Sequence, residues 1–243
     1  MGVVGGRKPP HQEDMILYID GASPSTVSSN RTQFSSMVKN GVVNRDVLTN
    51  DNAPTYVEAG LGSYMAFDGV DDALRWNNTG FSSTYEITVA MWMKPRSHSG
   101  GTYWRGFFSA RSTDGGNDHN TGVTMDMRNV ARSSFDTFNI EVGHGSSGNT
   151  DQMTSDIAWN TWTHVVGVVS TSQCIPYING VAEITKSKSN VSMALDYLVF
   201  GARTYGGNTG YAHVDIASWI VFNRVLTPAE ILTLYNENKF RYQ

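Results

Sequence analysis

Residues 162–181 read WTHVVGVVSTSQCIPYINGV, and residues 214–231 read VDIASWIVFNRVLTPAEI. In the first stretch, two runs rich in valine, isoleucine and tyrosine flank a polar turn, and Asn179-Gly180 then carries the signal of a two-residue hairpin. The second stretch is a long apolar run that leads into the start of a helix. Together the two stretches predict strands that pair in sequence order, which is typical of a β-sandwich.

The helix start is the most local of these signals. At Thr227 the sequence TPAE forms a capping box, in which the threonine oxygen accepts an amide hydrogen bond and Glu230 reaches back to the cap. The helix should run to about residue 236. Its apolar residues recur at helical spacing, so that one face docks on the sandwich; they are Ile231, Leu234 and Tyr235.

The strand pattern extends towards the N-terminus. Residues 86–93 are apolar on both alternating faces, which predicts a strand in the middle of a sheet. Residues 20–55 are polar, with turn signals, and are expected to be mostly loop. The other expected strands cover residues 15–19, 63–67, 73–76, 106–110, 122–127 and 135–142.

Composition favours a single globular domain. The chain has 243 residues, of which 40% are hydrophobic, and its 24 glycines against 7 prolines suit many short strands joined by tight turns. No linker-like segment divides the middle of the chain. We therefore expect an N-terminal arm at residues 1–14 and one domain over residues 15–243.

Charge and hydropathy argue against binding to nucleic acid and against a membrane-spanning segment. The net charge is −4 and the Lys and Arg residues are scattered singly, so nucleic acid is not an expected partner. No segment reaches membrane-spanning length, and residues 1–14 lack the apolar run of a signal peptide. The single cysteine, Cys174, lies among apolar residues and is expected to be buried and inert.

Four motifs in order carry a resemblance to a known family. They are FDGVDD at residues 67–72, WTHVVG at 162–167, YINGV at 177–181, and a closing pattern at 215–231 with aspartate, Asn-Arg, Leu-Thr and Glu-Ile at family spacing. The chain resembles the laminin G-like domains of the concanavalin A-like lectin-glucanase group over roughly residues 15–237. The resemblance implies an all-β, concanavalin A-like (laminin G-like) jelly-roll β-sandwich with one short C-terminal helix.

The resemblance also implies a structural calcium site. Related sandwiches join an early Asp-Gly segment to a late strand aspartate through calcium, which takes six to eight oxygen ligands. Here the implied ligands are Asp215 and Asp68, with Asp71 or Asp72 as further ligands. The alternative is that Asp68-Gly69 and Asp71-Asp72 form an ordinary turn, because aspartate favours such positions.

A second polar segment, residues 114–120, suggests ligand binding. Jelly-roll lectins combine Asp and Asn side chains with aromatic platforms that stack on sugar rings, and several aromatic residues here lie in loop-like surroundings. The alternative is a solvated turn with ordinary aromatic residues. The candidate ligand-binding residues are Tyr103, Trp104, Asp114, Asn117, Asp118, Asn120, Tyr205 and Tyr211.

No catalytic motif stands out. The E-x-D-x-E pattern of laminarinase-like hydrolases and the motifs of alginate-lyase-like jelly rolls do not occur, and neither does a zinc spacing or a nucleophile elbow. The nearest acidic candidates are Asp126, Asp136 and Glu141. Alternation places Asp136 and Glu141 on opposite faces of one strand, so they form a poor acid and nucleophile pair. His164, at the head of a strand, is expected to be a structural histidine.

These observations favour a non-catalytic recognition or structural module. The opening LYIDGASPS at residues 17–25 resembles short phage and marine bacterial surface proteins of the family. That resemblance implies a virion surface or extracellular location, as a capsid decoration or tail-fibre subunit. The expected partners are a glycan or host-surface ligand, further copies of the chain, and other virion proteins that the arm contacts. Two alternatives stay open: a carbohydrate-active enzyme (glycoside hydrolase or polysaccharide lyase) or its carbohydrate-binding module, and an adhesion domain excised from a longer bacterial chain.

Overall fold

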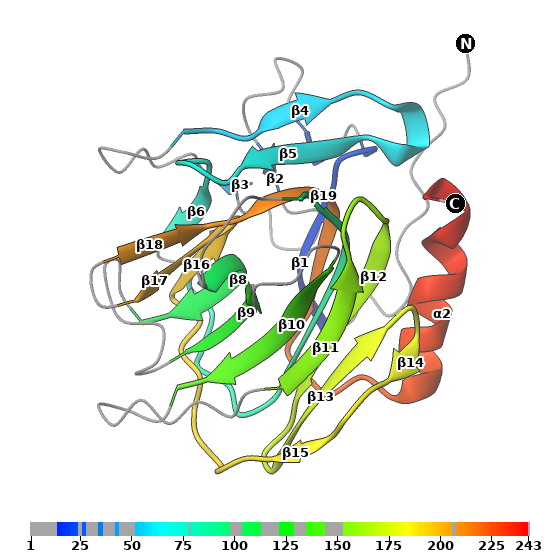
Figure 1. Cartoon of the computed structure of the whole chain (residues 1–243). Helices are drawn as coiled ribbons and strands as arrows, with labels where there is room; N and C mark the ends of the chain where they lie inside the picture. Colours follow the sequence, from blue (N-terminus) through cyan, green and yellow to red (C-terminus); the bar gives the residue numbers. More distant parts are fainter. Residues whose placement is uncertain are drawn as a thin grey trace.

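The computed structural model confirms the β-sandwich (Figure 1). It describes residues 14–23, 26–27, 34–35, 42–43, 52–77, 79–97, 104–112, 122–128, 135–143, 153–205 and 208–242. Within these residues two sheets, almost entirely antiparallel, pack face to face, as in other sandwiches. The nine-stranded sheet contains β1 (Met15–Asp20), β4 (Thr55–Val57), β5 (Tyr64–Asp68), β7 (Ile87–Pro95), β12 (Thr163–Val169), β13 (Gln173–Ile178), β14 (Val181–Ala182), β15 (Lys186–Ser187) and β19 (His213–Phe222).

The eight-stranded sheet forms the other layer. Outside both layers, β2 (Phe34–Ser35) pairs with β3 (Val42–Val43). This pair lies within residues 20–55, which were expected to be mostly loop. The eight strands are β6 (Leu74–Asn77), β8 (Trp104–Arg111), β9 (Val123–Arg128), β10 (Phe135–Val142), β11 (Met153–Ala158), β16 (Tyr197–Phe200), β17 (Ala202–Tyr205) and β18 (Asn208–Tyr211).

The strand that was predicted to be central is central. β7 lies between β12 and β19, and its residues are buried on both faces. One edge of β19 pairs with β7, while its other edge pairs with β5 and then with β1. The closing stretch of the sequence therefore joins strands from both ends of the chain in one sheet.

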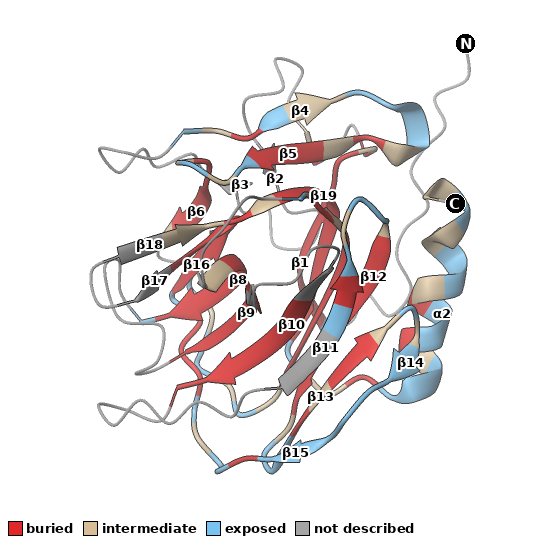
Figure 2. Ribbon diagram, viewed as in Figure 1, coloured by how far each residue is buried: buried red, intermediate tan, exposed pale blue. Residues whose placement is uncertain are grey.

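Most of the core lies between the two sheets. Figure 2 shows the central strands buried and the edge strands β14 and β15 exposed. Alternating residues of β7, such as Val89 and Met91, face Met125 of β9 and Ile140 of β10 across the sandwich in one buried cluster. The alternate positions of the same strands must then lie on the outer faces of the sheets.

The Asn-Gly hairpin forms as predicted. Asn179 and Gly180 have φ angles of 52° and 82°, the left-handed conformations that a type I′ turn between β13 and β14 requires. The Asn179 side chain also accepts a hydrogen bond from the backbone N–H of His164 at 3.0 Å. The turn therefore fixes the neighbouring strand β12 as well as its own hairpin.

The C-terminal helix also forms as predicted. α2 (Pro228–Asn238) begins with the capping box, in which the Thr227 hydroxyl accepts a hydrogen bond from the Glu230 N–H and the Glu230 carboxylate accepts one from the Thr227 N–H. The helix ends two residues later than expected and continues into the 3₁₀ turn η3 (Lys239–Arg241). Ile231 and Leu234 are fully buried against the outer face of the nine-stranded sheet.

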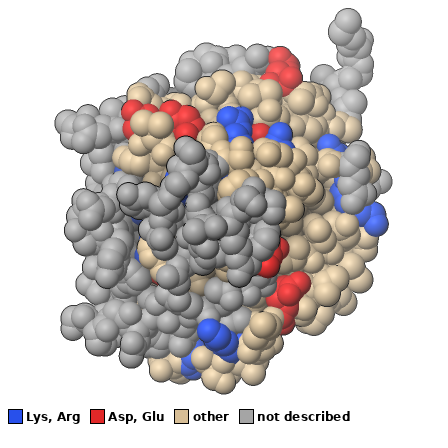
Figure 3. Space-filling view, in the orientation of Figure 1, with Lys and Arg blue, Asp and Glu red and all other residues tan. Residues whose placement is uncertain are grey.

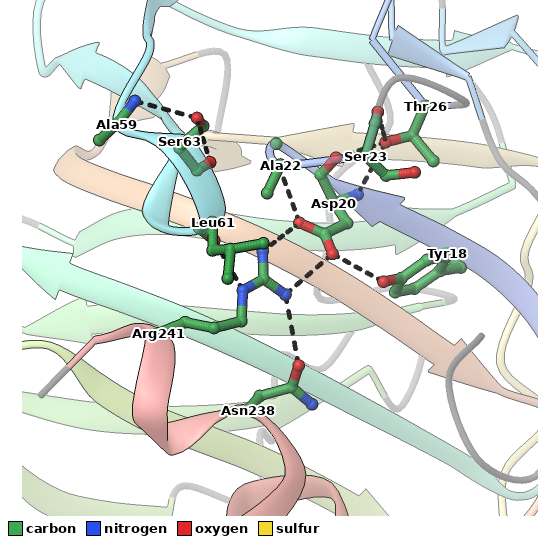
Figure 4. Close-up of polar contacts among 12 residues, drawn as sticks. Tyr18, Asp20, Ala22, Ser23, Thr26, Ala59, Leu61, Ser63, Asn238 and Arg241 are labelled. Carbon is green, nitrogen blue, oxygen red and sulfur yellow. Dashed lines mark hydrogen bonds and ion pairs between the residues drawn. The ribbon is translucent and has the colours of Figure 1, made fainter. Parts of the chain in front are cut away.

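An ion pair joins the end of β1 to η3 (Figure 4). The Arg241 guanidinium donates to both carboxylate oxygens of Asp20, at 2.9 and 2.6 Å, and to the Leu61 carbonyl at 2.7 Å. Tyr18 donates to the same carboxylate at 2.7 Å, and burial together with the Asp20 charge raises the pKa of its hydroxyl. Leu61 belongs to the 3₁₀ turn η2 (Gly60–Gly62), so three segments distant in sequence meet at Arg241.

Besides β2 and β3, six strands were not expected from the sequence pattern: β4, β11, β15, β16, β17 and β18. Figure 1 places the β17–β18 hairpin at the edge of the eight-stranded sheet, beside β8. A Cβ at Gly106 of β8 would collide with Arg203 and would lie 2.6 Å from the Ala202 carbonyl carbon, so glycine lets the hairpin approach this closely. In the part of the chain that the structure describes, no helix is long and apolar enough to cross a membrane.

Candidate functional site

The outer face of the eight-stranded sheet is unusually polar. Met125 and Met127 of β9, and Ile140 of β10, point into the core, so the residues between them point outward. We call this outer surface the polar face. Its side chains are nevertheless buried, with exposed fractions of 3% or less. The polar face consists of Ser109, Thr124, Asp126, Asn139, Glu141 and Arg203.

Four of these residues are joined by hydrogen bonds. The Arg203 Nη1 donates to the Asp126 Oδ2, and its Nη2 donates to the Glu141 Oε2 at 2.9 Å. The Asn139 Nδ2 donates to the Asp126 Oδ1 and to the Glu141 Oε1, each at 3.1 Å. Each of the four carboxylate oxygens therefore accepts a hydrogen bond, which is what buried charges require to offset their lost hydration.

Strand pairing brings the two carboxylates together. Asn139 of β10 lies directly opposite Asp126 of β9, and Glu141 lies opposite Thr124. Asp126 and Glu141 are thus diagonal neighbours on one face of an antiparallel pair. Arg203 enters from β17, a strand that reaches this place because Gly106 lets it approach β8.

An aromatic ring borders the network. Trp104, at the start of β8, is half-buried, and the Arg203 Cζ lies 5.4 Å from the centroid of a ring of its indole. Tyr211, at the end of β18, is also half-buried and is paired with Gly106. A cation over an indole face adds a specific attraction to the packing, so Trp104 is held in a defined orientation beside the charged network.

Two hydroxyls complete the polar face. The Ser109 Oγ and the Thr124 Oγ1 face each other across β8 and β9, and both are buried. Within the described residues neither oxygen has a hydrogen-bond partner. A buried hydroxyl without a partner costs roughly 1–3 kcal/mol, so these two groups mark a place beside Glu141 where a further hydrogen-bonding group would be stabilising.

The structure changes the interpretation of the candidate ligand residues. The expectation of loop-like surroundings was wrong for three of them, because Trp104, Tyr205 and Tyr211 each lie at the end of a strand. β8 and the β17–β18 hairpin bring these three backbone positions to one edge of the sheet. Five candidates lie outside the described residues: Tyr103, Asp114, Asn117, Asp118 and Asn120.

The acidic candidates for catalysis also rearrange. The pair considered from the sequence was Asp136 and Glu141, and the structure instead joins Glu141 to Asp126 through Arg203. Strand alternation gave the face of each residue, but the pairing of β9 with β10 was not visible in the sequence. Arg203 carried no motif, and its nearest signal was the Gly-Gly pair that follows Tyr205, typical of a two-residue hairpin loop.

Three of the four implied calcium ligands come together. Asp68, Asp71 and Asp72 place carboxylate oxygens within 4.8 Å of one another, and Figure 3 shows acidic side chains gathered near the end of β5. The Asp68 Oδ1 also accepts hydrogen bonds from the backbone N–H groups of Val70, at 2.8 Å, and Asp71. These hydrogen bonds are the ones expected if the aspartates only form a turn. The same carboxylates are also the hard oxygen ligands that calcium takes. Calcium binding therefore stays a prediction.

The fourth implied ligand, Asp215, has cationic partners. Its Oδ2 lies 2.9 Å from the Lys94 Nζ, and its Oδ1 forms an ion pair with the Arg96 Nη2. Asp215 is 1% exposed, so a partner that offsets the cost of burial was expected. In the structure Lys94 and Arg96 fill this role, and Asp215 is not part of the acidic group near β5.

Comparisons with solved structures agree with the fold. The chain aligns with the binding domain of botulinum neurotoxin DC in complex with SialylT (TM-score 0.65, 12% identity), covering 93% of this chain and 51% of that one. It aligns similarly with the binding domain of Paraclostridial Mosquitocidal Protein 1 (TM-score 0.64, 13% identity), covering 93% and 52%. This chain thus spans about half the length of those two chains.

A single-domain structure matches over nearly its whole length. It is domain 4 of AbnA, a GH43 extracellular arabinanase from Geobacillus stearothermophilus, in complex with arabinotriose. The TM-score is 0.60 at 16% identity, and the alignment covers 91% of this chain and 98% of that one.

Sequence comparison supplies the family. No curated protein matches the chain. The family model for Laminin_G_3, described as the concanavalin A-like lectin/glucanases superfamily, matches residues 68–232, which is more than half of the 243 residues. The resemblance expected from the four motifs is therefore confirmed, and this chain belongs to the Laminin_G_3 family of the concanavalin A-like lectin/glucanases superfamily.

Proposed function

We propose that this chain is a non-catalytic glycan-binding module whose ligand stacks on Trp104 at the border of the polar face. The observation that carries the proposal is the half-buried indole of Trp104 beside the buried Arg203 network. Glycan sites combine an apolar platform for the ring face with a few fixed polar groups that orient the hydroxyls. Trp104 provides the platform, and the buried polar face holds that platform in place through the contact of Arg203 with the indole.

The network makes this border rigid before a ligand arrives. Arg203 is held by two carboxylates, and Asn139 holds both of those carboxylates in turn. A side chain that is already ordered loses little entropy on binding, so less of the interaction energy is spent on ordering the site.

The structural neighbours support a binding role. The arabinanase domain, which matches this chain over 98% of its own length, is described in complex with arabinotriose. The two toxin chains are described as binding domains, one of them in complex with SialylT. Those ligands belong to the other proteins, and at this level of identity the alignments give the fold alone. The bound arabinotriose and SialylT make glycan binding the first function to test on this fold. The position of the proposed site comes from Trp104.

An enzyme is the alternative that one observation favours. Asp126 and Glu141 share a face, as the two carboxyl groups of a glycoside hydrolase would. Their four oxygens, however, already accept hydrogen bonds from Arg203 and Asn139, whereas a general acid must offer its proton to the substrate. Release of reducing ends or unsaturated uronates from a polysaccharide panel would establish the enzyme and overturn the non-catalytic assignment.

The Trp104→Ala variant tests the binding site. We expect it to weaken binding to arabino-oligosaccharides, or to whichever neutral glycan a panel identifies, by roughly tenfold, because it removes the stacking surface. Isothermal titration calorimetry measures the affinity directly. Tyr85→Ala is the matched control and should leave the affinity unchanged, since Tyr85 is an exposed aromatic residue just before β7, in the other sheet. Equal affinities for wild type and the Trp104 variant would contradict the assignment.

We further propose that the module lies on a virion surface, as a capsid decoration or tail-fibre subunit. The support is the LYIDGASPS opening and its resemblance to phage surface proteins. Such a subunit should form a stable homo-oligomer, which light scattering after size exclusion would detect, and removal of residues 1–14 should weaken that oligomer. A monomer that labels no virion preparation would favour the excised adhesion domain or the detached carbohydrate-binding module.

A further inference from the structure

We propose a second binding site, on the outer face of the nine-stranded sheet, that takes the carboxylate of an acidic sugar. The site consists of Lys94, Arg96 and Asp215, which we call the cation cluster, together with Trp162. It is on the opposite sheet from the polar face and does not depend on the glycan site proposed there.

The cation cluster is built around a buried carboxylate. Lys94 of β7 pairs with Asp215 of β19 in the sheet register, and Arg96 follows directly after the end of β7. The Asp215 side chain is 1% exposed, whereas the side chains of Lys94 and Arg96 are 25% and 32% exposed. Asp215 therefore lies beneath two cations that still reach the solvent.

The cluster carries an excess positive charge. Two cations and one carboxylate leave one positive charge uncompensated, and within the described residues Lys94 and Arg96 have no other carboxylate partner. One cation would suffice to offset the burial of Asp215, and a second adds repulsion between like charges. An incoming carboxylate would remove this excess.

Arg96 has the donors that such a ligand needs. It contacts Asp215 through Nη2. A guanidinium has five N–H donors in a planar fork, and that fork matches a carboxylate in a two-point contact. Asp215 therefore fixes the direction of the Arg96 side chain from beneath, while within the described residues the other donors of this third-exposed side chain meet no carboxylate.

Aromatic rings border the same cations. The Lys94 Nζ lies 5.3 Å from the ring centroids of both Tyr64 and Trp162. Trp162 is held between Tyr64, whose ring is 5.5 Å away edge-on, and Tyr242, whose ring is 5.0 Å away. Tyr64, Trp162 and Tyr242 are all half-buried, so part of this ordered aromatic surface is accessible.

The combination identifies the class of ligand. A carboxylate alone would need only the cations, and a neutral sugar would need only the aromatic platform. A uronic or sialic acid carries both a carboxylate and an apolar ring face, so it can contact Arg96 and Trp162 together. Acidic oligosaccharides are therefore the ligands that match the whole site.

The experiment uses the full chain with trigalacturonate and sialyllactose as probes. Carboxyl-reduced trigalacturonate and lactose are their neutral counterparts. By isothermal titration calorimetry, an acidic probe should bind at least tenfold more tightly than its neutral counterpart, and Arg96→Gln and Trp162→Ala should each lower its affinity at least tenfold. Arg96→Gln keeps the Lys94–Asp215 pair, so the fold should be retained, and near-UV circular dichroism checks this.

The variants also separate this site from the polar face. Trp104→Ala should leave the affinity for acidic probes unchanged. If Trp104→Ala lost binding of the acidic probes and Arg96→Gln kept it, the second site would be overturned and the proposed function would stay intact. Absence of binding by both acidic probes at millimolar concentration would also overturn the inference. An acidic probe that binds equally well to wild type and to Trp162→Ala would overturn the sugar assignment, because the cations alone would then account for binding.

Discussion

Replacing Arg203 by methionine should lower the free energy of unfolding by about 3–5 kcal/mol, because the change removes the guanidinium that pairs with the buried carboxylates of Asp126 and Glu141. Both carboxylates are almost inaccessible to solvent, at 0% and 3% exposed, so hydration cannot replace the lost guanidinium. Methionine keeps much of the length and the packing of the arginine stem. Urea denaturation followed by tryptophan fluorescence measures the loss.

A triple variant separates the effect of charge from the effect of packing. Adding Asp126→Asn and Glu141→Gln to Arg203→Met removes the uncompensated charges, and it should recover a large part of the lost stability. Removing one partner of a buried ion pair costs more stability than replacing both partners with uncharged residues. If Arg203→Met costs less than about 1 kcal/mol, the network is hydrated or otherwise compensated, and its role as a rigid base for Trp104 fails.

The sequence predicted those parts of the fold that depend on local signals. The Asn179-Gly180 turn and the Thr227 capping box each lie within a few residues, and both form as expected. The central position of β7 followed from its apolar residues on both faces. Each of these signals can be read in a single window of sequence because the interactions behind it are short-range.

The candidate site depends on long-range pairing instead. Asp126 and Arg203 are 77 residues apart, and Glu141 and Arg203 are 62 apart, so no local pattern relates them. Alternation predicted which face Glu141 occupies, but the strand β17 that brings in Arg203 was not expected. The partners of Asp215 were missed for a similar reason: its burial predicted a partner, and the register of β19 against β7 decides that the partner is Lys94.

Acid should destabilise this protein from about pH 6.5 downward because of His164. The ring is 2% exposed and packs against Trp92 and Tyr235, with centroid distances of 5.3 and 6.0 Å, and within the described residues its Nδ1 has no hydrogen-bond partner. Burial lowers the pKa of His164 from 6.5 to about 3. The unfolded chain therefore binds a proton below pH 6.5, whereas the folded protein excludes that proton until about pH 3.

The direction and size of the effect follow from proton linkage. Stability from His164 is fully present above pH 6.5 and is lost as the pH falls towards 3, by at most about 1.4 kcal/mol per pH unit and roughly 5 kcal/mol in total. Glu230 adds a separate loss, since the Arg224 guanidinium lowers the pKa of its carboxyl from 4.5 to about 2. That second loss begins only below about pH 4.5, so measurements between pH 6.5 and 5 isolate the histidine.

His164→Gln provides the decisive comparison, because it keeps a polar side chain of similar length at the same place but cannot titrate. Urea midpoints from pH 8 to 5 should fall for the wild type and stay nearly level for the variant. The difference between the two proteins at pH 8 measures the packing lost against Trp92 and Tyr235, and this cost does not vary with pH. The two stability curves should therefore converge as the pH falls. Parallel curves would mean that the His164 ring takes up its proton as readily in the folded protein as in the unfolded chain, so that burial against Trp92 and Tyr235 does not hold its pKa down.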